Sequence, residues 1–245
     1  MFDTHIPLYA IMILLSLVAN IIIVSLMCKS YQFHKNEIIG AIVYENIGII
    51  WGAIIFTLFA KHGLSTFRML FEGVDLSNLG LSAYGGVIGA IVCLIIFSVQ
   101  FKKPVKDMLF IFMPSIPLMY AIGKIGCFLV GCCHGIEYAG LGSVMYRYPA
   151  VAPANTYLFP VQLVETIVFT LIFIYMAVKS FKQKFNLKIL GFSFVLCGFG
   201  KFALDFLRMS NIGQVLSLNQ IVSIVFMVIG IVIVCKYREI SPVRI

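Results

Sequence analysis

Three ionisable residues stand near the end of one apolar stretch, at spacings that let them act together. Lys201, Asp205 and Arg208 are four and three residues apart, which places them on one face of a helix. An ionisable side chain in hydrocarbon is costly unless it is paired or hydrated, so its presence is a functional hypothesis. Two interpretations stay open. The run is either a charge-paired helix end, or part of a site where Lys201 and a second lysine, Lys124, face an anion such as a lipid phosphate while Asp205 orients one of them.

The densest motif of the chain surrounds Lys124. Its glycines permit close approach of the backbone to a neighbouring helix or to a ligand, but packing alone does not explain a buried lysine. Lys124 would favour a thiolate nearby, so a nucleophilic or hydrogen-bonding thiol stands beside inert packing as an interpretation. We predict no metal site, because adjacent cysteines point different ways on a helix and no second Cys/His pair accompanies them. The motif reads Gly123-Lys124-Ile125-Gly126-Cys127-Phe128-Leu129-Val130-Gly131-Cys132-Cys133-His134-Gly135.

Two shorter motifs add polar groups at the starts of other apolar stretches. Tyr84, Gly85 and Gly86 open one of them, and a tyrosine in such a place is commonly an interface anchor. Gln162 and Glu165 lie three residues apart after a proline, at a helix start where a carboxylate is electrostatically favoured. Structural and ligand-positioning roles are equally open for this second pair.

The composition requires a membrane around these residues. Of the 245 residues, 61% are hydrophobic and 11% charged, with a mean hydropathy of +1.04, which excludes a soluble fold. Nucleic-acid binding is disfavoured although the net charge is +8, because Lys102-Lys103 is the longest basic block. The seven cysteines are an odd number and imply no disulfide framework.

The elements that position the polar residues are apolar runs of about 20 residues, the length that crosses a bilayer. They predict an all-α, polytopic integral membrane protein with about seven transmembrane helices, forming a single domain over residues 1–245. The first run has no basic residue before it and no small-residue cleavage site, so we expect it to remain in the protein. The predicted spans are Ile6–Cys28, Ile38–Ala60, Leu79–Phe101, Met108–Cys133, Pro160–Val178, Lys188–Phe206 and Gln214–Cys235.

Basic residues in the connections predict the orientation. Twelve Lys and Arg residues fall on one side of the predicted spans and four on the other, namely Lys61, Arg68, Arg147 and Arg208. Because short cytoplasmic loops are enriched in Lys and Arg, the N-terminus is predicted outside and the C-terminus in the cytoplasm. Apart from Glu45, in the cytoplasmic half of the second span, the intramembrane polar residues then fall in the outer half of their spans, which predicts a polar chamber there. The long connection between residues 134 and 159 is predicted to be irregular and to lie at the interface.

At these motifs the sequence resembles the prolipoprotein diacylglyceryl transferase family, over nearly the whole chain. The family signature, roughly G-R-x-G-N-F-x-N-x-E-x-x-G, is similar in spacing to the run from Gly123 to Gly135. An H-G-G-x-I-G segment resembles Tyr84 to Gly89, and H-P-S-Q-L-x-E resembles Phe159 to Glu165. The run R-x-x-x-E-x-x-R resembles Lys201, Asp205 and Arg208 in order and spacing.

The resemblance implies a bacterial cytoplasmic membrane enzyme that uses no cofactor and whose site faces the outer leaflet. It would move a diacylglyceryl group from phosphatidylglycerol to the lipobox cysteine of a prolipoprotein, or to another thiol acceptor, forming a thioether and releasing glycerol phosphate. The implied catalytic residues are Tyr84, Lys124, Cys132 and Lys201, and the implied substrate-binding residues are Gly85, Gly86, Cys127, Gly135, Gln162, Glu165, Asp205 and Arg208.

Several signature residues are replaced in this chain. Lysines stand for two arginines, Cys127 and Cys132 for an asparagine and a glutamate, and Tyr84 for a histidine. Lysine keeps the charge but loses the bidentate fork of arginine, and we expect Lys124 to lower the pKa of Cys132. A non-catalytic lipid-binding or accessory membrane protein is therefore an alternative hypothesis, as is a transferase with another acceptor. A transporter is disfavoured by the odd number of spans and by the clustering of polar residues in one half.

Overall fold

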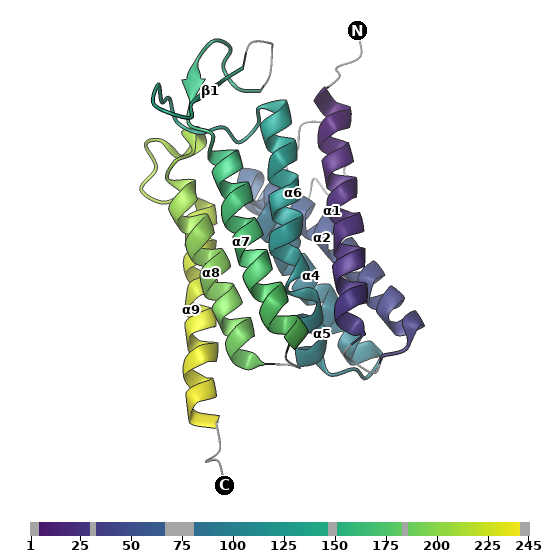
Figure 1. Ribbon diagram of the computed structural model, residues 1–245. Helices are drawn as coiled ribbons and strands as arrows, with labels where there is room; N and C mark the ends of the chain where they lie inside the picture. Colours follow the sequence, from purple (N-terminus) through teal and green to yellow (C-terminus); the bar gives the residue numbers. More distant parts are fainter. Residues whose placement is uncertain (1–4, 30–32, 67–80, 147–150, 183–185, 241–245) are drawn as a thin grey trace. The chain divides into compact units, whose positions relative to one another are not determined.

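The computed structural model describes residues 5–29, 33–66, 81–146, 151–182 and 186–240 (Figure 1). It divides into two compact units. The larger unit holds Met1–Ile23 and Met113–Ile245, and the smaller unit holds Val24–Phe112. The prediction of a single domain over residues 1–245 stays a prediction.

In the larger unit, helices that follow one another along the chain pack side by side. Helix α6 packs on α7, α7 on α8, and α8 on α9. The first helix begins at one end of this unit and α9 ends at the other (Figure 1). The helices are α1 (His5–Cys28, to Ile23 in this unit), α6 (Ser115–Val130), α7 (Val161–Lys182), α8 (Leu187–Asp205) and α9 (Leu218–Ile240), with the 3-10 helix η2 (Met209–Asn211) between α8 and α9.

The smaller unit is built on a close crossing of two helices, α2 (Lys35–His62) and α4 (Ala83–Gln100), with η1 (Gly63–Ser65) and α5 (Val105–Phe112). Glycines face each other where the two helices cross. A Cβ on Gly89 would collide with the backbone carbonyl of Gly48, and a Cβ on Gly85 with that of Gly52. Without side chains at these positions the two backbones approach closely, as small-residue helix pairs do in membranes.

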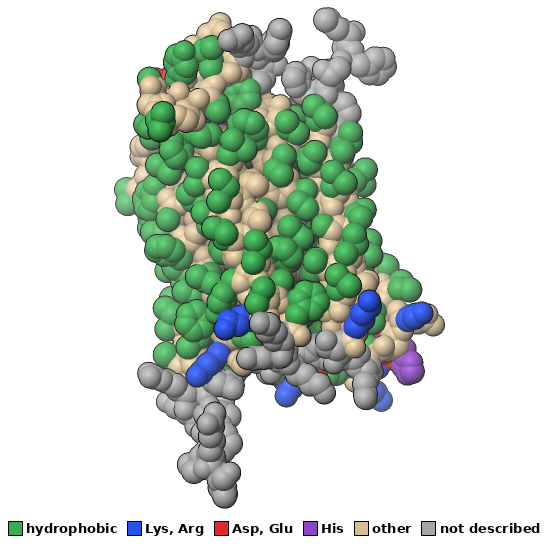
Figure 2. Space-filling view, in the orientation of Figure 1, with side chains coloured by type: hydrophobic (Ala, Val, Ile, Leu, Met, Phe, Trp, Pro, Cys, Tyr) green, Lys and Arg blue, Asp and Glu red, His purple; other side chains and the backbone are tan. Residues whose placement is uncertain are grey.

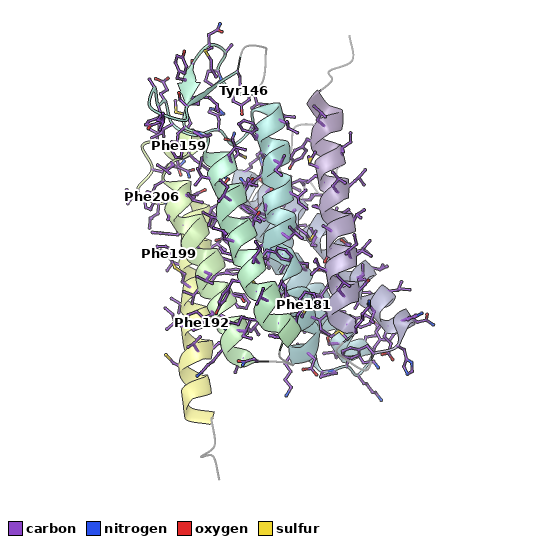
Figure 3. All side chains as sticks on the ribbon, viewed as in Figure 1. Tyr146, Phe159, Phe181, Phe192, Phe199 and Phe206 are labelled. Carbon is purple, nitrogen blue, oxygen red and sulfur yellow. The ribbon has the colours of Figure 1, made fainter. Side chains whose placement is uncertain are left out.

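Seven helices of the described residues are long and apolar enough to cross a membrane, which confirms the predicted fold class. Apolar side chains remain exposed along them: Phe192, Phe199 and Phe206 recur every seven residues along α8 and its C-cap and are 46%, 61% and 54% exposed (Figure 3). Figure 2 shows such apolar side chains covering one face of the helices.

The predicted orientation, with the N-terminus outside, stays a prediction. Several of the basic residues on which it rests lie outside the described residues, namely Arg68, Arg147, Lys184 and Arg244.

The fourth predicted span, Met108–Cys133, is wrong in two details. The helix is interrupted between α5 and α6 at Met113 and Pro114, because proline lacks the backbone N–H and restricts the residue before it. Helix α6 then ends at Val130, three residues early. Gly131 adopts the left-handed conformation (φ 73°) and donates its N–H to the carbonyl of Phe128, a common way for a helix to end.

The connection from α6 to α7, predicted to be irregular, contains two short strands. Strand β1 (Val144–Met145) pairs antiparallel with β2 (Tyr157–Leu158). An isolated bridge joins Gly135 to Arg208, just after α8. This connection therefore ties the C-terminal end of α6 to the C-terminal end of α8.

The variant Gly89→Ala tests the close crossing of α2 and α4. Its Cβ would collide with backbone, so we expect the free energy of unfolding to fall by about 1–3 kcal/mol. Gly86→Ala on the same helix is the matched control, because its Cβ would meet Ile49 at 3.4 Å, an ordinary contact. Thermal unfolding of the purified variants in detergent measures the difference, and equal midpoints for both would contradict the crossing.

Candidate functional site

The site is organised around the fully buried carboxylate of Glu165, which lies in the second turn of α7. Lys124 Nζ lies 2.8 Å from its Oε2, and Lys201 Nζ lies 3.1 Å from its Oε1. Arg208 donates from Nη2 to both oxygens at 3.0 and 3.1 Å, and the hydroxyl of Tyr120 donates to Oε1 at 2.7 Å. One carboxylate thus gathers side chains from α6, from α8 and from the segment after α8.

A second buried carboxylate, Asp205, extends this arrangement to α9. Lys201 Nζ donates to its Oδ1 at 2.7 Å. Asn211 donates to Oδ2 at 2.9 Å and the hydroxyl of Ser217 donates to the same oxygen at 2.6 Å. Ser217 and Gln220 form reciprocal hydrogen bonds at the start of α9, the pattern of a capping box. We call Glu165, Asp205, Lys124, Lys201, Arg208 and Tyr120 together the Glu165 cluster.

The Glu165 cluster carries an excess of positive charge. At their ordinary charges its three cations, Lys124, Lys201 and Arg208, and its two carboxylates leave one net positive charge. Burial opposes the charge of Arg208, but the neighbouring acidic groups, with Glu165 the strongest of them, together outweigh burial, so the pKa of this guanidinium is raised. In a site shielded from water, this excess charge favours binding of an anion.

Helical spacing explains how neighbouring members of the cluster meet. Tyr120 and Lys124 lie four residues apart on α6, and Lys201 and Asp205 lie four apart on α8, so each pair shares a helix face. The Tyr120 ring also lies under two cations, with Lys124 Nζ 5.1 Å and Lys201 Nζ 5.9 Å from its centroid. Phe169 packs against the same ring, with the centroids 4.3 Å apart.

The structure brings five of the predicted site residues into direct contact: Lys124, Glu165, Lys201, Asp205 and Arg208. A sixth, Gln162, donates from Nε2 to the backbone carbonyl of Cys132 at 2.9 Å. Their predicted roles toward a substrate stay predictions.

Close backbone packing accounts for two other predicted site residues, Gly85 and Gly135. Tyr84, Gly85 and Gly86 belong to the smaller unit, and Gly85 stands against the backbone of α2. A Cβ on Gly135 would collide with the carbonyl of Phe159, which explains this glycine by the close approach of two chain segments. The substrate-binding roles predicted for these residues stay predictions.

The cysteines of the motif differ from expectation. The sulfur atoms of Cys127, Cys132 and Cys133 all lie within 4.8 Å of one another, so the expectation that adjacent cysteines point apart is wrong. Helix α6 has already ended at Val130, and the chain turns back. The expected lowering of the Cys132 pKa is also wrong, because hydrogen bonding with the thiols of Cys127 and Cys133 and burial raise it. Hydrogen bonds with the thiols of Cys127 and Cys132 instead lower the pKa of Cys133.

Sequence reasoning missed three partners of the cluster. Tyr120 stands one helical turn before Lys124, and that spacing was the available signal. Ser217 opens the pattern Ser-x-x-Gln that is typical of a helix start. For Asn211, which also donates to the backbone carbonyl of Asp205 at 2.8 Å, the sequence contains no comparable signal.

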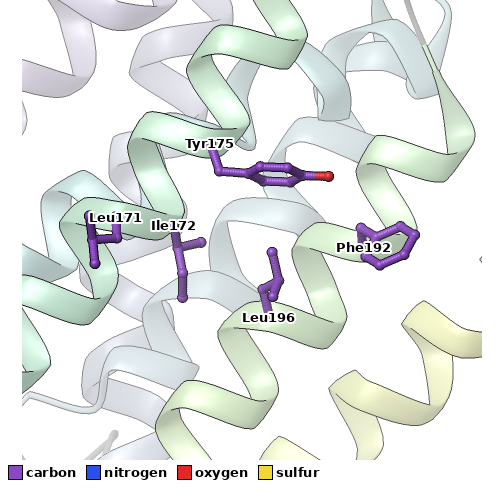
Figure 4. Close-up of a pocket in the computed structure, with 5 residues that line it drawn as sticks. All are labelled: Leu171, Ile172, Tyr175, Phe192 and Leu196. Carbon is purple, nitrogen blue, oxygen red and sulfur yellow. The ribbon is translucent and has the colours of Figure 1, made fainter.

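An open apolar groove of about 410 Å³ lies between α7 and α8 (Figure 4). In the close-up, Tyr175 of α7 extends toward Phe192 of α8. Both helices that form the groove also contribute to the Glu165 cluster, through Glu165 and Lys201. The lining residues are Leu171, Ile172, Tyr175, Phe192 and Leu196.

Comparison with known proteins gives one consistent family. The family model described as prolipoprotein diacylglyceryl transferase matches residues 1–236. The chain is 27% identical to the phosphatidylglycerol–prolipoprotein diacylglyceryl transferase of Clostridium tetani, over 91% of this chain and 90% of that protein. It is 28% identical to the protein of that name from Finegoldia magna, over 97% and 94%. The family match extends over far more than half of the sequence, so this chain belongs to the prolipoprotein diacylglyceryl transferase family.

Proposed function

We propose that this protein transfers the diacylglyceryl group of phosphatidylglycerol to a cysteine thiol of a prolipoprotein. Family membership and the names of its relatives support the reaction. We place it in a bacterial cytoplasmic membrane, with the Glu165 cluster on the side of the outer leaflet. The seven apolar helices support the membrane setting, and the distribution of Lys and Arg supports the orientation.

The Glu165 cluster is the observation that carries the proposal. In the reaction, the thiol loses its proton and its sulfur bonds to the glyceryl carbon that carries the phosphate. The bond from that carbon to the phosphate oxygen breaks, and glycerol phosphate leaves with the electron pair and takes up the proton that the thiol lost. Negative charge builds on the departing oxygen, and fixed cations in a water-poor site stabilise such charge. Glu165 holds three such cations in place, Lys124, Lys201 and Arg208, and they can stabilise the charge on the leaving phosphate.

The apolar groove supports a lipid as the substrate. Leu171 follows Glu165 by six residues, about 9 Å of helical rise, and Leu196 precedes Lys201 by five residues, about 8 Å. Glu165 lies near the start of α7 and Lys201 near the end of α8, whereas the groove residues lie nearer the middle of each helix. A phospholipid with its phosphate at the Glu165 cluster can therefore lay an acyl chain along α7 and α8.

A reconstituted assay tests the reaction. The purified protein in vesicles containing phosphatidylglycerol should add a diacylglyceryl group to a synthetic lipobox peptide, detected by mass spectrometry. A peptide with serine in place of the acceptor cysteine is the control and should gain nothing. Binding of phosphatidylglycerol without any lipidated peptide would contradict the transferase and favour a non-catalytic lipid-binding protein.

The variant Lys124→Met tests the role of the cations. Methionine is similar in length but uncharged, so the net charge of the cluster falls from one positive charge to zero. We expect the affinity for phosphatidylglycerol to fall about tenfold or more, the effect of losing one hydrogen bond to a charged group. Affinity for zwitterionic phosphatidylethanolamine should change much less.

Lys179→Met is the matched control for this measurement, because Lys179 is exposed near the other end of α7. Lipid binding to both variants is measured in detergent by competition with a fluorescent phospholipid. Equal losses for the two lipids in Lys124→Met, or no loss, would mean that this lysine serves helix packing alone.

A further inference from the structure

Three thiols meet at the end of α6, beside the Glu165 cluster. The sulfur atoms of Cys127, Cys132 and Cys133 lie within 4.8 Å of one another. Two backbone features bring them together: Gly131 has φ 73°, and Cys133 has φ 53°, an uncommon value for a residue with a side chain. The first ends the helix and the second turns the chain back toward Cys127.

This spacing suits a single metal ion. Zinc binds cysteine sulfur at about 2.3 Å, so two sulfur atoms on one tetrahedral zinc lie roughly 3.8 Å apart. The sulfur atoms are at most 4.8 Å apart, so side-chain rotations that shorten each separation by about 1 Å or less would reach this value. Thiolates are soft ligands that select Cu⁺ and Zn²⁺ over Mg²⁺ and Ca²⁺.

Access to the thiols is graded. Cys127 is buried, Cys132 is half-buried and Cys133 is exposed, so an ion can enter from the side of Cys133. The backbone carbonyl of Cys132 is held by Gln162 of α7, which fixes the turn that presents the thiols.

We propose that Cys127, Cys132 and Cys133 form a binding site for one soft metal ion, Zn²⁺ or Cu⁺. This site goes beyond diacylglyceryl transfer. It also replaces the prediction of no metal, which assumed that the helix continues through Cys133. The ion joins the C-terminal end of α6 to the turn that follows it.

Metal titration of the full-length, reduced protein in detergent tests the site. Zn²⁺ and, under reducing anaerobic conditions, Cu⁺ are added in competition with a chromophoric chelator. One equivalent of at least one of the two ions should bind. Cys127→Ser and Cys133→Ser should each weaken that binding by more than the roughly 10–100-fold that loss of an outer-shell partner costs. Cys235→Ser is the control, because this exposed cysteine lies on α9, and it should bind as the wild type does.

A second measurement uses the unmodified protein and needs no folded variant. The ion that binds should protect Cys127, Cys132 and Cys133 together from alkylation, read by mass spectrometry, while Cys235 stays reactive. The proposal is overturned if the reduced protein binds neither ion, or if one equivalent still binds at full affinity to Cys127→Ser and Cys133→Ser. Protection of one of the three cysteines without the others would also overturn it.

Discussion

A fully buried carboxylate must find positive charge within the protein, and Glu165 imposes this requirement on the larger unit. Its oxygens are reached by Lys124 from α6, Lys201 from α8 and Arg208 beyond α8. Removing one partner of a buried ion pair costs about 3–5 kcal/mol, because the remaining charge is left uncompensated. The helices are therefore held in one register by the same contacts that present the cations. Asp205 extends the network to the start of α9 through Ser217.

The arrangement suits the anionic lipid that we propose as the substrate. The cations are oriented before the substrate arrives, so little reorganisation is needed when negative charge develops on the leaving phosphate. The surplus positive charge suits an anionic headgroup. The apolar groove lies on the same two helices, α7 and α8, nearer to their middles. The lysines at positions 124 and 201 act as point charges, without the bidentate geometry of arginine.

The sequence predicts the membrane spans and most of the cluster, because hydropathy and helical spacing are local properties. It marks Lys201, Asp205 and Arg208 as one group, yet the central position of Glu165 depends on the packing of three helices and has no local signal. The meeting of the three thiols was missed for a related reason. It depends on the end of α6 at Gly131 and on the positive φ of Cys133, and a glycine within an apolar run does not by itself indicate that the helix stops there.

The most direct test of the account is the rate of diacylglyceryl transfer by Glu165→Gln, measured in phosphatidylglycerol vesicles on protein whose helix content matches the wild type. Glutamine keeps the shape but removes the charge that holds the three cations, so we expect a rate lower by on the order of 100-fold. Glu137→Gln, at an exposed position in the connection between α6 and α7, is the control and should retain the wild-type rate. Loss of a stabilising group lowers a rate by about 100-fold or more. A rate for Glu165→Gln within about twofold of the wild type would therefore contradict the claim that Glu165 organises the site.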